Sequence, residues 1–139
     1  MKILTGVPAE RLNDIPSLTE AAEHNGFSGL STQENRHNPF LPLAIAAVHS
    51  QHLELRTNVA IAFARSPMVA AGLAWDLQYA TAGRFVLGLG SQVKGHNQRR
   101  FSVAWSPPAP RLREYIEAIR AIWACWRDGT SLQYEGQHY

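Results

Sequence analysis

The side chains that could bind a metal ion or transfer a proton include six histidines and eleven carboxylates in a chain of 139 residues. They form neither a His-x-His nor a His-Glu-x-x-His pattern, which are spacings that bring two imidazoles to one metal ion. We therefore expect no metal site. The single cysteine, Cys125, cannot form an internal disulfide, and its place within a helical pattern predicts a small buried apolar side chain.

Two glycines, Gly88 and Gly90, are reminiscent of a loop that binds phosphate. A dinucleotide-binding fingerprint requires a further glycine at position 93, where the sequence has Val93. We therefore interpret Gly88 and Gly90 as a tight strand end, which lets another group or a neighbouring strand come close.

The net charge of the chain is small, because 13 basic and 11 acidic side chains give +2. The one basic cluster, from Lys94 to Arg100, is followed by a single aromatic residue, Phe101. Nucleic-acid-binding surfaces show longer basic stripes with several aromatic side chains. The longest apolar run, Leu41–Val48, is too short to span a bilayer and contains a proline. We therefore expect neither a nucleic acid nor a membrane as partner.

The elements that must position these residues follow an alternation of short apolar runs and longer helical patterns, which is typical of βα units in a parallel sheet. Strands are expected over Lys2–Val7, Phe27–Thr32, Leu55–Ala64 and Arg84–Gly90. Helices are expected over Ile15–His24, Leu43–Gln51, Pro67–Thr81 and Arg111–Arg127. The remaining segments are a long loop and the start of another extended element, over Ser91–Pro110 and Tyr134–Tyr139. The expected fold class is α/β, with four consecutive βα units and no linker between them.

Three motifs, in their order along the chain, resemble one family. They are Gly26-Phe-Ser-Gly-Leu30 with Ser31-Thr-Gln-Glu34 after it, Ala64-Arg-Ser-Pro67, and Ala82-Gly-Arg-Phe-Val-Leu-Gly-Leu-Gly-Ser91. The sequence is similar to the amino-terminal half of the luciferase-like monooxygenase superfamily, and within it to oxidoreductases that use the deazaflavin coenzyme F-420. The resemblance implies half of a (β/α)8 TIM barrel with a parallel sheet, formed by residues 1–139 as a single domain.

The resemblance also implies an oxidoreductase that transfers a hydride between a small-molecule substrate and the ring of coenzyme F-420, or of FMN as the alternative. Family members often place an acidic residue directly before a histidine in the loop after the second strand. Glu34 and His37 are the catalytic candidates here, although Asn35 stands where the family has the histidine. An imidazole exchanges protons near neutral pH, which suits this role. The alternative for His37 is a solvated loop histidine.

Cofactor-binding residues are implied at the carboxyl ends of the third and fourth strands. Ala62 and Phe63 stand where deazaflavin-dependent members carry a bulge with a non-prolyl cis peptide behind the ring. Ordinary packing in the barrel core is the alternative for both. Gly90 allows a close approach, and Ser91 and Gln92 offer polar contacts at the edge of the cofactor. We expect these five residues to hold the cofactor.

A complete barrel of this family needs about 250 residues, and four βα units supply half. The outer strands would then present open edges, and the side chains that face the barrel axis would form an uncovered apolar face. Charged residues make up only 17% of the chain, below the usual ~25%, which favours a homo-oligomer that pairs these edges. A sheet covered by the long loop and a truncated product are the alternatives.

The competing hypothesis for the function is a catalytically silent half-barrel that acts as an interaction or assembly domain. The sequence shows no signal peptide after Met1, and it has a single cysteine. Both observations predict a cytoplasmic protein.

Overall fold

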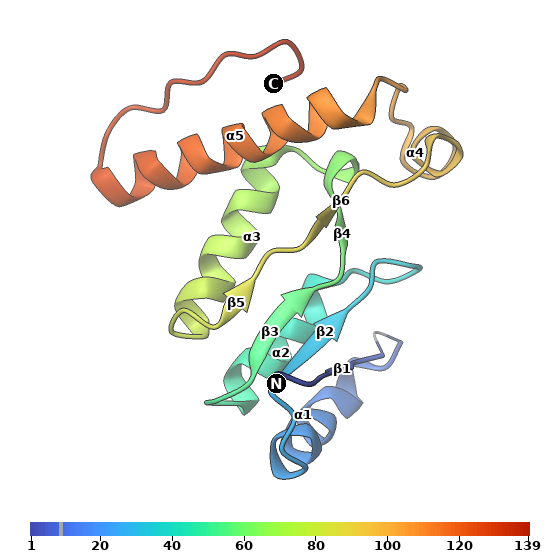
Figure 1. Cartoon of the computed structure of the whole chain (residues 1–139), viewed down its shortest axis with the longest axis vertical. Helices are drawn as coiled ribbons and strands as arrows, with labels where there is room; N and C mark the ends of the chain where they lie inside the picture. Colours follow the sequence, from blue (N-terminus) through green and yellow to red (C-terminus); the bar gives the residue numbers. More distant parts are fainter. Residues whose placement is uncertain (9) are drawn as a thin grey trace. The chain divides into compact units, whose positions relative to one another are not determined.

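Four parallel strands form the main sheet of the computed structural model, which describes residues 1–8 and 10–139. The order across the sheet is β1-β2-β3-β5, so that each strand pairs with the next one along the chain except where β4 intervenes (Figure 1). The strands are β1 (Leu4–Gly6), β2 (Gly29–Thr32), β3 (Glu54–Thr57) and β5 (Phe85–Val86). A separate two-stranded sheet is formed by β4 (Ala60–Ile61) and β6 (Leu89–Gly90). The prediction of an α/β fold with a parallel sheet is confirmed.

Helices alternate with the strands, as the sequence predicts. They are α1 (Ile15–His24), α2 (Phe40–His49), α3 (Pro67–Ala80), α4 (Lys94–Phe101) and α5 (Pro108–Asp128). Two short 3-10 helices, η1 (Leu12–Asp14) and η2 (Ala62–Ala64), adjoin α1 and β4. The chain divides into two compact units, Met1–Ala60 with Ala74–Leu89, and Ile61–Leu73 with Gly90–Tyr139. The single domain over residues 1–139 stays a prediction.

The predicted third strand, Leu55–Ala64, is wrong beyond Thr57. The peptide bond between Asn58 and Val59 is cis, β4 follows as a two-residue strand, and the chain then turns into η2. The predicted fourth strand, Arg84–Gly90, is likewise divided into β5 and β6. Gly88 lies between these two strands, where its N–H donates to Thr57 Oγ1 at 2.9 Å instead of extending the sheet ladder. Each predicted strand is therefore two short strands, because side-chain hydrogen bonds replace backbone pairing at the break.

The loop predicted over Ser91–Pro110 is wrong in part, since it contains α4 and the first turn of α5. The sequence of α4 is Lys-Gly-His-Asn-Gln-Arg-Arg-Phe, which has no repeating apolar side chains and therefore no helical pattern to detect. Ser102 ends the helix in the left-handed conformation, with φ 55°. The extended element predicted over Tyr134–Tyr139 is also wrong, since no strand forms there.

In the first unit, the two faces of the main sheet differ in chemistry. Leu30, Leu55 and Phe85 lie side by side in the strand register and are buried, on the face where α1 and α2 pack. Side chains alternate along a strand, so the neighbours of these residues occupy the opposite face. Glu54 and Arg56 lie there and form an ion pair, and Lys2 Nζ lies 2.9 Å from Glu54 Oε2. Val86, the register partner of Arg56, lies on the same face and is 42% exposed, so this face combines charged and apolar side chains.

In the second unit, α5 packs its apolar face against the amino-terminal half of α3. Tyr115, Ile119 and Ile122 are buried, as their spacing of three and four residues predicts. Trp123 Nε1 donates to the Ala71 carbonyl at 3.1 Å. Cys125 is only half-buried and its thiol lies 2.8 Å from the Thr130 carbonyl, so the prediction that it is buried is wrong.

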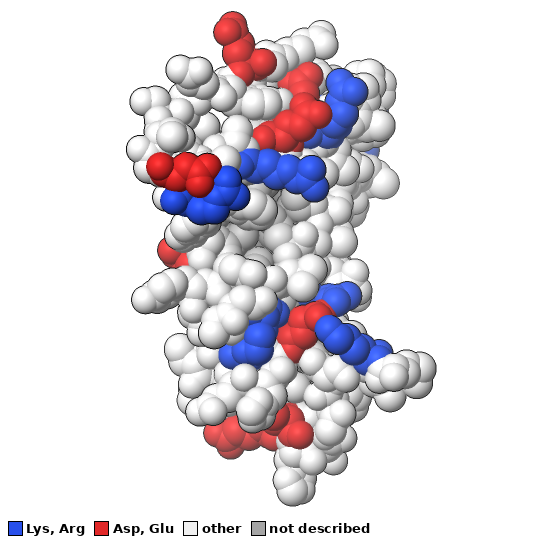
Figure 2. Space-filling model, turned by 60° about the vertical axis from the view of Figure 1, so that its left-hand side comes forward, with Lys and Arg blue, Asp and Glu red and all other residues white. Residues whose placement is uncertain are grey.

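The surface carries few charges, and these are mixed in sign. On the face drawn in Figure 2, basic and acidic side chains lie beside one another and most of the surface is uncharged. Pairs of this kind on α5 are Arg113 with Glu117, at 3.7 Å, and Arg127 with Asp128, at 2.7 Å. Among the described residues, no helix combines the length and apolar character that crossing a membrane requires.

Candidate functional site

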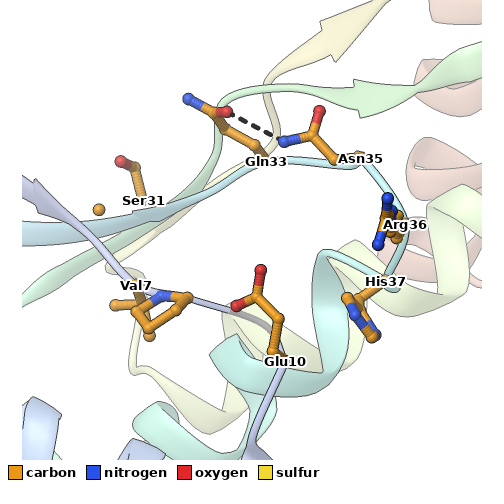
Figure 3. Close-up of a pocket in the computed structure, with 9 residues that line it drawn as sticks. Val7, Glu10, Ser31, Gln33, Asn35, Arg36 and His37 are labelled. Atoms are coloured by element: carbon orange, nitrogen blue, oxygen red, sulfur yellow. Dashed lines mark hydrogen bonds between the residues drawn. The ribbon is translucent and has the colours of Figure 1, made fainter.

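An open pocket lies in the first unit, at the carboxyl ends of β1 and β2 (Figure 3). Its volume is about 460 Å³, within the range of about 300–1,000 Å³ that is usual for small-molecule sites. Its lining consists of Gly6, Val7, Pro8, Glu10, Ser31, Gln33, Asn35, Arg36 and His37. In barrels of parallel strands the functional residues stand on the loops at this end of the sheet. The pocket is therefore the first candidate for a site in this unit.

Hydrogen bonds at both ends hold the loop that follows β2. Val7 N donates to the Ser31 carbonyl at 2.9 Å, which extends the pairing of the first two strands beyond the end of β1. Thr32 Oγ1 donates to the Pro39 carbonyl at 2.8 Å, and Phe40 N donates to Asn38 Oδ1 at 2.8 Å as α2 begins. The short loop between these anchors has few conformations left, so its side chains are presented to the pocket in a defined way.

The two predicted catalytic residues occupy different places in this loop. His37 is exposed and lines the pocket. Glu34 is 9% exposed and is not among the lining residues. His37 is thus accessible to a ligand in the pocket, whereas Glu34 belongs to the buried side of the loop.

Glu10 and Arg36 are pocket residues that the sequence analysis missed. The Glu10 carboxylate is directed into the open space, while Arg36 and His37 lie at its edge (Figure 3). Within residues 1–8 and 10–139, no hydrogen bond or ion pair is found for Glu10, Arg36 or His37. By contrast, the neighbouring Arg11 pairs with Asp14 at 3.2 Å. The one sequence signal that could have identified Glu10 and Arg36 is their position in the loops directly after the first and second strands.

Two of the predicted cofactor-binding residues, Ala62 and Phe63, lie in η2 of the second unit. They are 0% and 6% exposed, and they do not end a strand as expected. The Phe63 ring meets the Tyr115 ring edge-on at 6.5 Å, and the Arg111 guanidinium lies 4.5 Å from its centre. Both side chains are therefore packed within their own unit. The cis peptide expected behind a ring at this place is found instead between residues 58 and 59.

The other three predicted cofactor-binding residues, Gly90, Ser91 and Gln92, are half-buried in the second unit. Gln92 has φ 56°, a left-handed conformation that is uncommon for a residue other than glycine and occurs often at functional sites. The Ser91 carbonyl accepts a hydrogen bond from Asn97 Nδ2 at 2.9 Å. Asn97 is 5% exposed, and its Oδ1 atom has no hydrogen-bond partner among the described residues. A buried amide oxygen of this kind is a ready acceptor for a ligand N–H or O–H group.

In the first unit, the carboxylates with a displaced pKa, Glu23 and Glu54, lie outside the pocket and toward the amino-terminal end of the sheet. A hydrogen bond from Lys2, and then one from Arg56, lowers the pKa of Glu54 below its usual value. A hydrogen bond from the Ser50 hydroxyl lowers the pKa of Glu23, and the backbone N–H of residue 52 contributes in the same direction. These charged groups are paired within the fold, so we assign them a structural role.

Comparison with known proteins identifies the family of the chain. The model of the family described as luciferase-like monooxygenase matches residues 2–139. The uncharacterized protein Rv1360 of Mycobacterium tuberculosis is 54% identical over 119 residues, which are 86% of this chain and 35% of that protein. A second protein of the same organism, Rv3520c, bears the provisional name of a coenzyme F-420-dependent oxidoreductase. It is 35% identical over 127 residues, which are 88% of this chain and 35% of that protein. The chain thus spans about a third of the length of these relatives.

Solved structures show the same fold. The oxygenating constituent of 3,6-diketocamphane monooxygenase from Pseudomonas putida, a type II Baeyer–Villiger monooxygenase solved in complex with FMN, matches with a TM-score of 0.83 and 15% identity. The match covers 100% of this chain and 43% of the other. Because the structural neighbours are TIM-barrel enzymes and less than half of each is matched, the prediction of a half-barrel is confirmed.

Proposed function

The chain belongs to the luciferase-like monooxygenase family, and we propose that it forms half of a deazaflavin- or flavin-dependent oxidoreductase that transfers a hydride at the cofactor ring. The observation that carries this proposal is the pocket at the carboxyl ends of β1 and β2, where three ionisable side chains, Glu10, Arg36 and His37, line one open space. Among the relatives of the chain, Rv3520c bears the provisional name of a coenzyme F-420-dependent oxidoreductase. Enzymes with a barrel of parallel strands have their active sites at the carboxyl ends of the strands, where a few polar side chains orient the ligand.

The residues that would hold the cofactor all lie within the second unit. Deazaflavin and flavin rings present an N–H donor between two carbonyl oxygens, and the unpartnered Oδ1 atom of Asn97 has the chemistry to accept from that donor. Gly90, Ser91 and Gln92 would lie along the ring edge, since Asn97 is hydrogen-bonded to Ser91. When bound, the ring supplies hydride transfer, which protein side chains cannot perform alone.

Ala62 and Phe63 would support the cofactor through the backbone of η2. Their side chains are packed within the second unit, and Arg65 Nη1 donates to the Ile61 carbonyl at 3.0 Å just before them. A short helix packed in this way gives a rigid support. We therefore propose a positioning role for these two residues.

His37 is proposed as the group that gives a proton to the substrate or takes one from it. It is exposed in the pocket, and an imidazole can act in either direction near neutral pH. Glu34 is proposed as a positioning residue for the same loop, because it is buried at the base of the loop and does not line the pocket.

Coenzyme F-420 is the cofactor we favour, with FMN as the alternative. Rv3520c, at 35% identity, carries an F-420 name, whereas the FMN complex shares 15% identity and supports only the fold. The single cysteine favours a cytoplasmic location.

A second candidate function is a catalytically silent half-barrel that acts as an assembly domain. Large apolar side chains on the outside of the first unit favour it, since Tyr79 is 88%, Val48 76% and Leu41 52% exposed. The outer strands of the main sheet, β1 and β5, would pair with a second copy of the chain in a homo-oligomer.

Titration of the 139-residue protein with coenzyme F-420, and separately with FMN, tests the two functions. We expect a perturbed F-420 absorbance spectrum and binding that Asn97→Leu weakens at least tenfold, because a buried acceptor is lost. Gln98→Leu, on the exposed side of the same helix, is the control and should bind as the wild type does. Absence of binding by either cofactor at millimolar concentration would reject the enzyme in favour of the assembly domain. Light scattering that shows a strict monomer would reject the homo-oligomer.

A further inference from the structure

The pocket of the first unit combines ionisable groups that have no partner in the described part of the chain. Elsewhere, carboxylates such as Glu54 and Asp128 are engaged by basic side chains. Glu10 and Arg36 line the same pocket, and neither is found in an ion pair or a hydrogen bond within residues 1–8 and 10–139. Charged groups left open toward one concave surface are a sign of a ligand site rather than of a structural one.

The donors and acceptors of this pocket define the ligand. An ionised carboxylate such as that of Glu10 only accepts hydrogen bonds, and a guanidinium such as that of Arg36 only donates them. Asn35 Nδ2 donates to Gln33 Oε1 at 3.4 Å, which leaves the Gln33 amide nitrogen and the Asn35 oxygen for a ligand. The ligand must therefore offer a hydrogen-bond donor to Glu10 and an acceptor to Arg36.

The charge of the pocket distinguishes between neutral and charged ligands. Glu10 and Arg36 contribute opposite charges, so their sum is zero when His37 is neutral. A carboxylate that paired with Arg36 would lie in the field of Glu10, and an ammonium that paired with Glu10 would lie in that of Arg36. A neutral molecule with a hydroxyl and a carbonyl oxygen meets both side chains without repulsion.

From these groups we infer that the pocket binds small neutral hydroxycarbonyl compounds, with the hydroxyl donating to Glu10 and the carbonyl accepting from Arg36. The inference deepens the proposed function, because the bound molecule would be the substrate of the proposed oxidoreductase. Glu10 is then a specificity-determining residue. Binding itself needs no cofactor, so the inference can fail or hold independently of hydride transfer.

Amide-resolved NMR titration of the 139-residue protein, without cofactor, tests the inference with three probes. Hydroxyacetone has both groups, methoxyacetone keeps the carbonyl but cannot donate, and lactate has the hydroxyl beside a carboxylate. We expect hydroxyacetone to shift the amides of pocket residues and to bind about tenfold more tightly than methoxyacetone, because the bond to a charged acceptor is lost in the latter. Lactate should bind more weakly than hydroxyacetone.

Variants assign the preference to the side chain. Glu10→Ala should bind hydroxyacetone and methoxyacetone equally, and it should keep its fold because Glu10 is exposed. Glu20→Ala removes an exposed carboxylate on α1, outside the pocket, and should keep the tenfold preference. Equal binding of the two ketones by the wild type, a preference that survives in Glu10→Ala, or tighter binding of lactate would overturn the inference. Failure of F-420 to bind while this preference holds would reject the proposed oxidoreductase and retain the ligand site.

Discussion

Replacement of Gly88 by alanine should destabilise the first unit through one steric conflict. A Cβ atom at residue 88 would lie 2.1 Å from the Thr57 carbonyl oxygen, a backbone atom that cannot move without displacing β3. Three hydrogen bonds hold Gly88 close to the segment from Thr57 to Ala60. Gly88 N donates to Thr57 Oγ1 at 2.9 Å, Thr57 Oγ1 donates to the Gly88 carbonyl at 2.7 Å, and Ala60 N donates to the same carbonyl at 2.8 Å.

The expected cost is about 3 kcal/mol. A methyl group forced into a packed site costs about 1–3 kcal/mol, and each hydrogen bond lost as the segments separate costs about 1 kcal/mol. No backbone penalty adds to this cost, because Gly88 is not in the left-handed region. The change should remove a large part of a total stability of about 5–15 kcal/mol.

Urea unfolding followed by circular dichroism measures this effect, with Gly72→Ala as the matched control. Gly72 lies within α3, where a Cβ atom would meet nothing within 4 Å. Alanine favours a helix interior over glycine by about 1 kcal/mol, so the control should raise the unfolding midpoint while Gly88→Ala lowers it. A Gly88→Ala protein as stable as the wild type would refute the close approach of Thr57 and Gly88.

Two further predictions concern the amino-terminal end of the main sheet. The pKa of Glu54 is lowered by Lys2 and by a neighbouring arginine, so its stabilising effect is present above about pH 4.5 and is lost as the pH falls through the lowered pKa. Glu54→Gln should therefore unfold at lower urea than the wild type at pH 7, by about 1 kcal/mol, and this difference should shrink at pH 3. Arg84 donates to the backbone carbonyls of Ser50 and Leu53, so Arg84→Met should cost about 2 kcal/mol in the same assay. An unchanged midpoint would contradict the structural role of this arginine.

The helices were more predictable from the sequence than the strands. The limits of α1 agree with the expectation, because an apolar repeat and the turn residues Asn25 and Gly26 mark them. The sequence did not predict where the third and fourth strands are interrupted, after Thr57 and near Gly88. The interruptions depend on hydrogen bonds between two residues that are 31 positions apart, and the apolar pattern of the strands does not show such bonds. The sequence did not predict helix α4, because the helix has no repeating apolar side chains. The residue that it buries is a polar one, Asn97.

The sequence predicted which loops lie at this edge of the sheet, but not which of their side chains line the pocket. The βα alternation placed the loops after the first and second strands at one edge of a sheet, which pointed to the region of His37. The sequence offered no reason to choose Glu10 over Glu34, since both are acids in such loops. The structure separates them, because Glu34 is buried while the Glu10 carboxylate faces the pocket (Figure 3).

Taken alone, the amino-acid sequence determined the α/β class, the order of the units and the family, because these depend on local periodicity and on contiguous motifs. Tertiary structure alone decided that Glu10 and Arg36 line one pocket, and that Asn97 donates to the Ser91 carbonyl while its Oδ1 atom stays without a partner among the described residues. These arrangements depend on the positions in space of loops that are far apart in the sequence. The sequence pattern alone does not give the distances between such loops.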